Sequence, residues 1–170
     1  MDEGFEVLTL IQTGKSSMIP IVLVEGANQT YWQEFDHAMR TMRERLAAHP
    51  LPLQFPIGKE DSFIGIIDFI DQKAIVWLED ILGAKFEILD VEQLWDPEFL
   101  KARPEIANAL RISAINREFY KERRDKMVEY IAEHDDSLVA KYLSGEELTS
   151  QELRDSVRRS TMALKLVPVL

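Results

Sequence analysis

The stretch that decides the fold, His49 to Trp77, reads HPLPLQFPIGKEDSFIGIIDFIDQKAIVW. Its apolar residues alternate with polar ones over short runs, which is typical of strands that face the core on one side only. The pair Asp71-Gln72 predicts a tight hairpin turn between two of these runs. Pro52 and Pro56 lack amide donors, so we expect the first run at a sheet edge or at a strand start. A small, mostly antiparallel sheet is therefore predicted.

The sheet is expected to continue past this stretch, with helices on either side of it in the chain. AKFEILD, residues 84–90, predicts a further strand after a turn at Leu82-Gly83. In residues 30–50, an apolar stripe at helical spacing predicts a helix that Pro50 ends. Residues 112–143 are predicted to be mostly helical. Val91 to Arg111 is ambiguous, because Trp95, Pro97 and Pro104 interrupt any long element. The apolar stripe in residues 30–50 consists of Phe35, Met39, Met42 and Leu46.

The end of the chain carries a clear signal for the start of a helix. Thr149 and Glu152 form the capping-box pattern, flanked by Leu148 and Leu153 as a hydrophobic staple. We expect the buried side of this helix to continue through Val157 and through residues 161–164. The closing KLVPVL predicts a strand.

The first 37 residues have a different sequence pattern from the rest. EGFEVLTLIQ, residues 3–12, predicts a short helix stopped near Gly14, and MIPIVLVEG, residues 18–26, predicts a strand buried on both faces. Helix followed by buried strand is half of an α/β unit. The fold class expected for the whole chain is α+β, a small sheet with packed helices, preceded by a helix-strand fragment of a Rossmann-like fold.

Composition narrows the class of protein. The 170 residues include no cysteine, which excludes disulfides, thiolate zinc sites and a cysteine nucleophile. No apolar run is long enough to cross a membrane, and the acidic N-terminus lacks the features of a signal peptide, so a cytoplasmic protein is expected. The formal net charge is -10, which disfavours direct binding to nucleic acid and favours a basic partner.

Motifs for catalysis or metal binding are incomplete. TGKS, residues 13–16, ends like a phosphate-binding loop, yet Thr9 stands where that loop needs a glycine. His37, His49 and His134 are not spaced as metal ligands, and His134-Asp135-Asp136 is more simply a polar helix end. We expect most carboxylate pairs, such as Asp2-Glu3, Glu79-Asp80 and Glu146-Glu147, to be surface charge, and Trp77 to lie in the core.

From about residue 38 to residue 170 the chain resembles bacterial elongation factor G, the ribosomal translocase. The resemblance rests on residues 39–77, on LGAKFEI, and on AEHDDSLVAKYLSGEELTSQELRDSVRRSTMALKLVPVL. It implies the late part of a GTP-binding domain with its inserted subdomain, a role in translation, and contact with the stalk proteins of the large ribosomal subunit. The family binds GTP and magnesium through motifs placed before Met39. None of these motifs occurs here, so no nucleotide-binding or metal-binding residue and no cofactor is expected, and the chain alone is expected to be inactive.

Residues 1–37 resemble a second family, the lonely-guy or lysine-decarboxylase-like phosphoribohydrolases, through MDEGFEVLTLIQTGKSSMIPIVLVEGANQTYWQEF. In that family's signature the functional glutamate would correspond to Glu3, while the glycine loop that holds phosphate is missing. The two resemblances imply a chimera of two fragments, joined near Asp36 to Met39. Two alternatives stay open: a phosphoribohydrolase remnant that uses Glu3, and a noncatalytic acidic interaction module.

Overall fold

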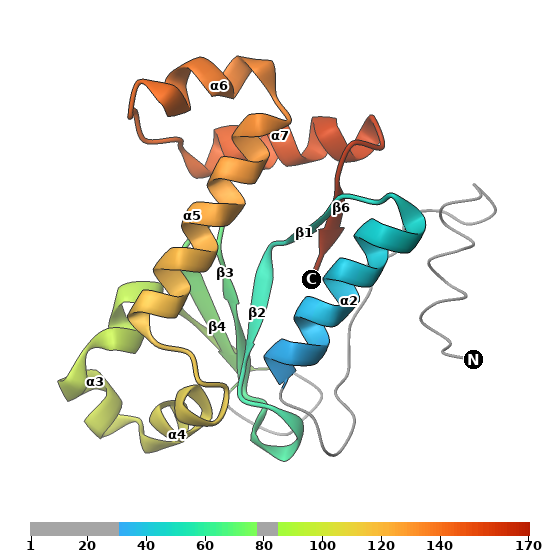
Figure 1. Cartoon of the computed structure of the whole chain (residues 1–170). Coiled ribbons are helices and arrows are strands. Elements are labelled where there is room, and N and C mark those ends of the chain that lie inside the picture. Colours follow the sequence, from blue (N-terminus) through green and yellow to red (C-terminus); the bar gives the residue numbers. More distant parts are fainter. Residues whose placement is uncertain (1–30, 78–84) are drawn as a thin grey trace. The chain divides into compact units, whose positions relative to one another are not determined.

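A computed structural model describes residues 31–77 and 85–170 (Figure 1). These residues divide into two compact units. Of the described residues, 31–52 and Val157–Leu170 form one unit, and those within Leu53–Ser156 form the other. Each unit combines helices with strands, and one of them holds a mostly antiparallel sheet. The α+β fold class expected from the sequence is confirmed. The helix and the strand expected at residues 3–12 and 18–26 lie outside the described residues.

The Leu53–Ser156 unit contains a four-stranded antiparallel sheet in the order β2-β3-β4-β5. The predicted hairpin is present, because β3 and β4 pair with Asp68 opposite Lys73 and the turn passes through Gln72 at a φ of 54°. β2 lies at a sheet edge, as the proline at position 56 requires. The strands are β2 (Gln54–Ile57), β3 (Gly65–Asp68), β4 (Lys73–Trp77) and β5 (Phe86–Asp90).

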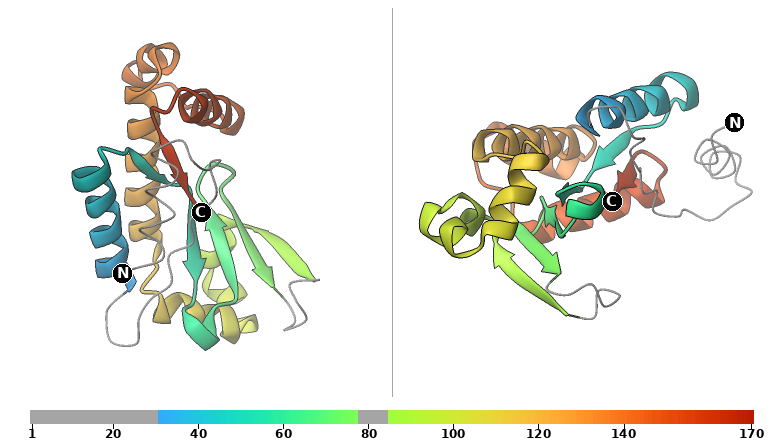
Figure 2. Two further views of the ribbon diagram at one scale, coloured as in Figure 1. Left: turned by 90° about the vertical axis from the view of Figure 1, so that its right-hand side faces the viewer. Right: turned by 90° about the horizontal axis from the view of Figure 1, so that it is seen from below.

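Helices cover one face of this sheet, as Figure 2 shows. The buried side chains of the strands meet an aromatic cluster in which Phe55 contacts Phe69 edge-on, with ring centroids 5.0 Å apart. The ring centroid of Phe119, in helix α5 (Arg117–Glu133), lies 5.9 Å from that of Phe55, and Tyr120 stacks on Phe69 at 5.3 Å. Burial of these large rings supplies much of the core of the unit.

The ambiguous stretch after β5 forms three short helices. Pro97 and Pro104 each begin a helix rather than merely breaking one, because a first-turn position needs no amide donor. Asp96 caps the first of these helices by accepting a hydrogen bond from the amide of Glu98. The three helices are η2 (Val91–Trp95), α3 (Pro97–Ala102) and α4 (Pro104–Ile112). A further 3-10 helix, η1 (Glu60–Ser62), precedes β3.

The predicted helical region 112–143 consists of two helices, α5 (Arg117–Glu133) and α6 (Asp136–Leu143). Asn116 caps α5 by accepting from the amide of Phe119, and Asp135 caps α6 by accepting from the amide of Ser137. The break between them lies at His134, whose ring nitrogen bonds to the carbonyl oxygen of Tyr130. The polar segment at 134–136 is thus a helix boundary.

The other unit contains helix α2 (Tyr31–Leu46) and the parallel pair β1 (Pro50–Pro52) and β6 (Val167–Val169). The predicted stripe of α2 is largely confirmed, because Phe35, Met39 and Met42 are buried. The closing strand is also confirmed, and it pairs with β1 in parallel. The expected junction at residues 36–39 lies within α2.

Helix α7 (Ser150–Met162) begins at the predicted capping box. Two of the burial predictions were wrong. Met162 and Leu164 are 80% and 77% exposed, because α7 ends at Met162 and Leu164 adopts a positive φ of 58° that turns the chain toward β6. Trp77 is only half-buried, since it alternates with the core residue Val76 and so points to the opposite face of the sheet.

Candidate partner-binding surface

Helix α5 buries one side and carries charged residues of both signs on the other, with three carboxylates in one row of its second half. Tyr120, Met127 and Ile131 are buried. Asp125, Glu129 and Glu133 recur at intervals of four residues on the solvent side, where all three are exposed. We call these three residues the acidic strip. Within the described part of the chain, none of them forms an ion pair or a hydrogen bond through its side chain.

The last residue of the acidic strip, Glu133, is placed unfavourably for the helix that carries it. Carboxylates near a helix C-terminus face the negative end of the helix dipole, and each costs about 0.3–1 kcal/mol at an exposed position. Glu133 is the last residue of α5, and the last turn contains no basic residue. Asp136, two residues after the C-cap His134, adds a further exposed carboxylate at the start of α6. The charge of Glu133 therefore does not serve the stability of α5.

A depression of about 210 Å³ lies beside α5. Its lining comes from α5, from the end of α6 and from the loop that leads to α7. Gly145 has a φ of +78°, and a Cβ at this position would meet no atom within 4 Å. The loop can therefore turn sharply and leave open space. The lining residues are Arg124, Val128, Tyr142, Gly145, Glu146, Glu147 and Leu148.

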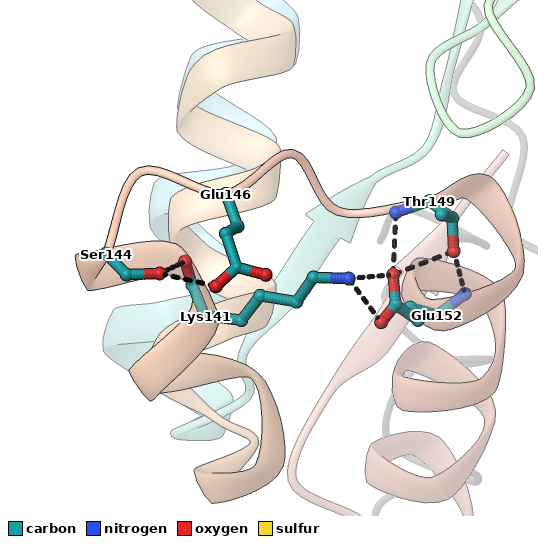
Figure 3. A network of polar contacts seen from close by, with 5 residues as sticks. All are labelled: Lys141, Ser144, Glu146, Thr149 and Glu152. Carbon is teal, nitrogen blue, oxygen red and sulfur yellow. Dashed lines mark hydrogen bonds and ion pairs between the residues drawn. The ribbon is translucent and has the colours of Figure 1, made fainter.

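A polar network fixes the loop that forms this depression (Figure 3). Lys141 Nζ reaches both carboxylate oxygens of Glu152, at 2.8 and 3.0 Å. The same carboxylate accepts from the amide and the hydroxyl of Thr149, each at 2.8 Å. At the other end of the loop, Ser144 donates to the carbonyl oxygen of Lys141 and to Glu146. The loop is thus held at both of its ends.

The hydrogen bond from Lys141, together with those from the Thr149 amide and hydroxyl, lowers the pKa of Glu152 from 4.5 to about 2. Because the folded-state pKa is depressed, the stabilisation is present above the unfolded pKa and is lost as the pH falls from 4.5 toward 2. We expect Glu152→Gln to flatten the loss of stability across that pH range. Urea unfolding at several pH values checks this, with Glu147→Gln as the control. Parallel pH profiles for the wild type and Glu152→Gln would contradict it.

The residues singled out in the sequence do not converge on a catalytic centre. Glu3 and the TGKS stretch lie outside the described residues, as do Glu79 and Asp80. His37 bonds to Arg40 on α2, and His134 belongs to the helix boundary. Among residues 31–77 and 85–170, no three His, Cys, Asp or Glu side chains gather as a metal ion would need. The sequence alone revealed neither the depression nor the part played in it by Arg124.

Comparison with known proteins gives the fold and no activity. The chain matches no protein-family model. Among solved structures it is similar to the protein ttk003000868 of Thermus thermophilus, with 24% sequence identity and a TM-score of 0.50. The similarity covers 79% of this chain and 16% of that one, so the chain spans about a sixth of that protein. In the described ranges, no helix is both long and apolar enough to cross a membrane.

Proposed function

We propose that the chain is a noncatalytic piece of a translational GTPase resembling elongation factor G, and that its acidic strip binds a basic surface on the large-subunit stalk of the ribosome. The observation that carries the proposal is the acidic strip itself. Its carboxylates are exposed and unpaired within the described residues, and the last of them, Glu133, lies at the end of α5, where a negative charge is least favourable. A partner that supplies positive charge would offset that cost.

The resemblance supplies the partner, and the rest of the unit is consistent with a docking module. The four-stranded sheet and its aromatic core form a rigid base, so the strip is presented on a helix that is anchored along its opposite side. A rigid surface loses little conformational entropy on binding. The nucleotide motifs of the family are missing from the sequence, and we expect the isolated chain to bind neither GTP nor magnesium.

The double variant Glu129→Lys/Glu133→Lys tests the strip. We expect its co-sedimentation with ribosomes to weaken by roughly tenfold or more, because two attractive charges become repulsive. Salt should weaken binding of the wild type more than binding of the variant. Stability should not fall, since lysine suits a helix C-terminus.

A matched control keeps the net charge of the double variant. Asp61 and Glu98 are exposed carboxylates outside α5, so Asp61→Lys/Glu98→Lys adds the same charge elsewhere on the unit. If this control lost ribosome binding to the same extent, net charge rather than the acidic strip would be responsible. Equal binding by the wild type and the strip variant would overturn the proposal.

A further inference from the structure

Strand β5 leaves one edge of the four-stranded sheet open (Figure 2). The Val91 amide donates to the Gln72 carbonyl oxygen at 3.1 Å, so every second residue before Val91 in β5 also bonds to β4. The backbone groups of the intervening residues Phe86 and Ile88 therefore point away from the sheet. Within the described part of the chain, no backbone hydrogen bond from outside the sheet reaches either residue. This edge offers donors and acceptors with which another strand can pair.

The opposite edge of the sheet, formed by β2, is blocked. The Phe69 amide donates to the Leu53 carbonyl oxygen at 3.0 Å, so the backbone of Pro56, three residues after Leu53, faces the open side of β2. Proline has no amide to offer an incoming strand, which is a usual protection of sheet edges. β5 contains no proline. Its last residue, Asp90, has its amide bonded to the side chain of Gln93 at 2.9 Å, and the amides of the earlier edge-facing residues remain available.

The side chains along the open edge are apolar. Ile88 is 59% exposed and Phe86 is 55% exposed. Ile88 lies directly opposite Ile75 of β4, which in turn lies opposite Ile66 of β3. A row of isoleucines thus crosses the sheet and ends at the open edge. Exposed apolar side chains on an unprotected edge strand favour association, because pairing removes them from water.

We propose that β5 pairs with β5 of a second copy of this chain, antiparallel and centred on Ile88, so that the two sheets join into one. Each Ile88 amide donates to the Ile88 carbonyl oxygen of the other copy, and each Phe86 amide donates to the Asp90 carbonyl oxygen. The two-fold axis passes between the two Ile88 residues at right angles to the sheet, so the isoleucine rows of the two copies become continuous. The pairing stops at two copies, because each open edge is then covered.

The self-complementarity of β5 identifies the second copy as the occupant and sets the register. In the register centred on Ile88, Glu87 lies opposite Leu89 and Phe86 lies opposite Asp90, so no two like charges are directly opposite. A register centred on Glu87 would place two glutamates opposite each other, which is destabilising. A register centred on Leu89 would place Ile88 opposite Asp90, whose amide is already occupied. The strand therefore has one favourable way of pairing with itself.

The oligomeric state of the full chain tests the pairing. Because the contact is small and each copy carries a net charge of -10, we expect a reversible dimer that dissociates between about 10 µM and about 1 mM. Sedimentation velocity at rising concentration measures the dissociation. In hydrogen exchange, the amides of Phe86 and Ile88 should become protected as the dimer forms. A monomer at the top of this concentration range, growth beyond the dimer, or a dimer that leaves both amides unprotected would overturn the inference.

Charge exchange at Ile88 tests the register. Ile88→Lys and Ile88→Glu each place two like charges opposite one another, so each should weaken dimerisation by roughly tenfold or more. An equimolar mixture of the two variants should form a mixed dimer, because lysine then lies opposite glutamate. The matched control Phe63→Lys replaces an apolar residue that is 46% exposed and lies outside β5, and it should dimerise like the wild type. Absence of the mixed dimer, or an equal loss in the control, would contradict the pairing.

Salt separates this inference from the proposed function, on which it does not depend. Dimerisation joins two copies of like net charge through apolar and backbone contacts, so raised salt should strengthen it, whereas ribosome binding by the acidic strip should weaken. Dimerisation that weakens with salt would contradict the inference. A wild-type chain that dimerises without binding ribosomes would overturn the proposed function alone. A chain that binds ribosomes but stays monomeric would overturn the inference alone.

Discussion

Phe55→Ala should destabilise the Leu53–Ser156 unit by about 3–5 kcal/mol, the usual cost of removing a buried aromatic ring. Phe55 is 2% exposed, and its ring lies between those of Phe69 and Phe119. The guanidinium of Arg123 lies 5.9 Å from its centroid. Because the ring joins β2 to α5, its loss would remove contacts from both layers at once. This loss is a large fraction of the roughly 5–15 kcal/mol that stabilises a typical domain.

Urea unfolding followed by circular dichroism measures this change. Phe63→Ala serves as the matched control, because it removes the same ring from a position that is 46% exposed. We expect the control to cost about 1 kcal/mol or less, as is usual for surface substitutions. Similar losses in the two variants would contradict the assignment of Phe55 to the core.

Gly58→Ala should be the second most damaging substitution. A Cβ at this position would lie 1.8 Å from the backbone oxygen of Ser62, and Gly58 has a φ of +87°. The residue cannot move freely, because its amide donates to the buried hydroxyl of Ser113 at 2.5 Å. The left-handed conformation costs about 1–2 kcal/mol for alanine and the overlap about 1–3 kcal/mol more. We expect a total loss of about 2–5 kcal/mol of unfolding free energy.

Gly145→Ala separates the two contributions. Gly145 has a similar φ of +78°, but its substituent would meet no atom within 4 Å. Only the conformational cost of about 1–2 kcal/mol applies there. Thermal or urea unfolding of the two variants should place Gly58→Ala well below Gly145→Ala in stability. Equal effects would mean that the turn at Gly58 relaxes without penalty.

Local patterns were enough to predict much of the fold. The alternation in residues 49–77 indicated the strands, and the Asp71-Gln72 pair indicated the hairpin between β3 and β4. Both features depend on neighbouring residues only, since turn chemistry and the period of two act over a few positions. The capping box at Thr149 and Glu152 was predictable for the same reason.

What could not be predicted depends on contacts between distant parts of the chain. The apolar strand around Trp77 predicts that this residue lies in the core. The helices that pack on a sheet, however, decide which of its two faces is covered. Leu164 looks like a continuation of an apolar stripe until the helix ends before it. The depression combines Arg124 of α5 with Gly145 of a later loop, so no spacing in the sequence reveals it.

The most direct test of the proposed function is co-sedimentation of the chain with two preparations of large ribosomal subunits, one intact and one stripped of its stalk proteins. We predict binding to intact subunits that weakens as salt is raised, loss of that binding on stripped subunits, and its return when the stalk proteins are added back. Equal binding to both preparations, or no binding to intact subunits at low salt, would contradict the proposal that the acidic strip recognises the stalk.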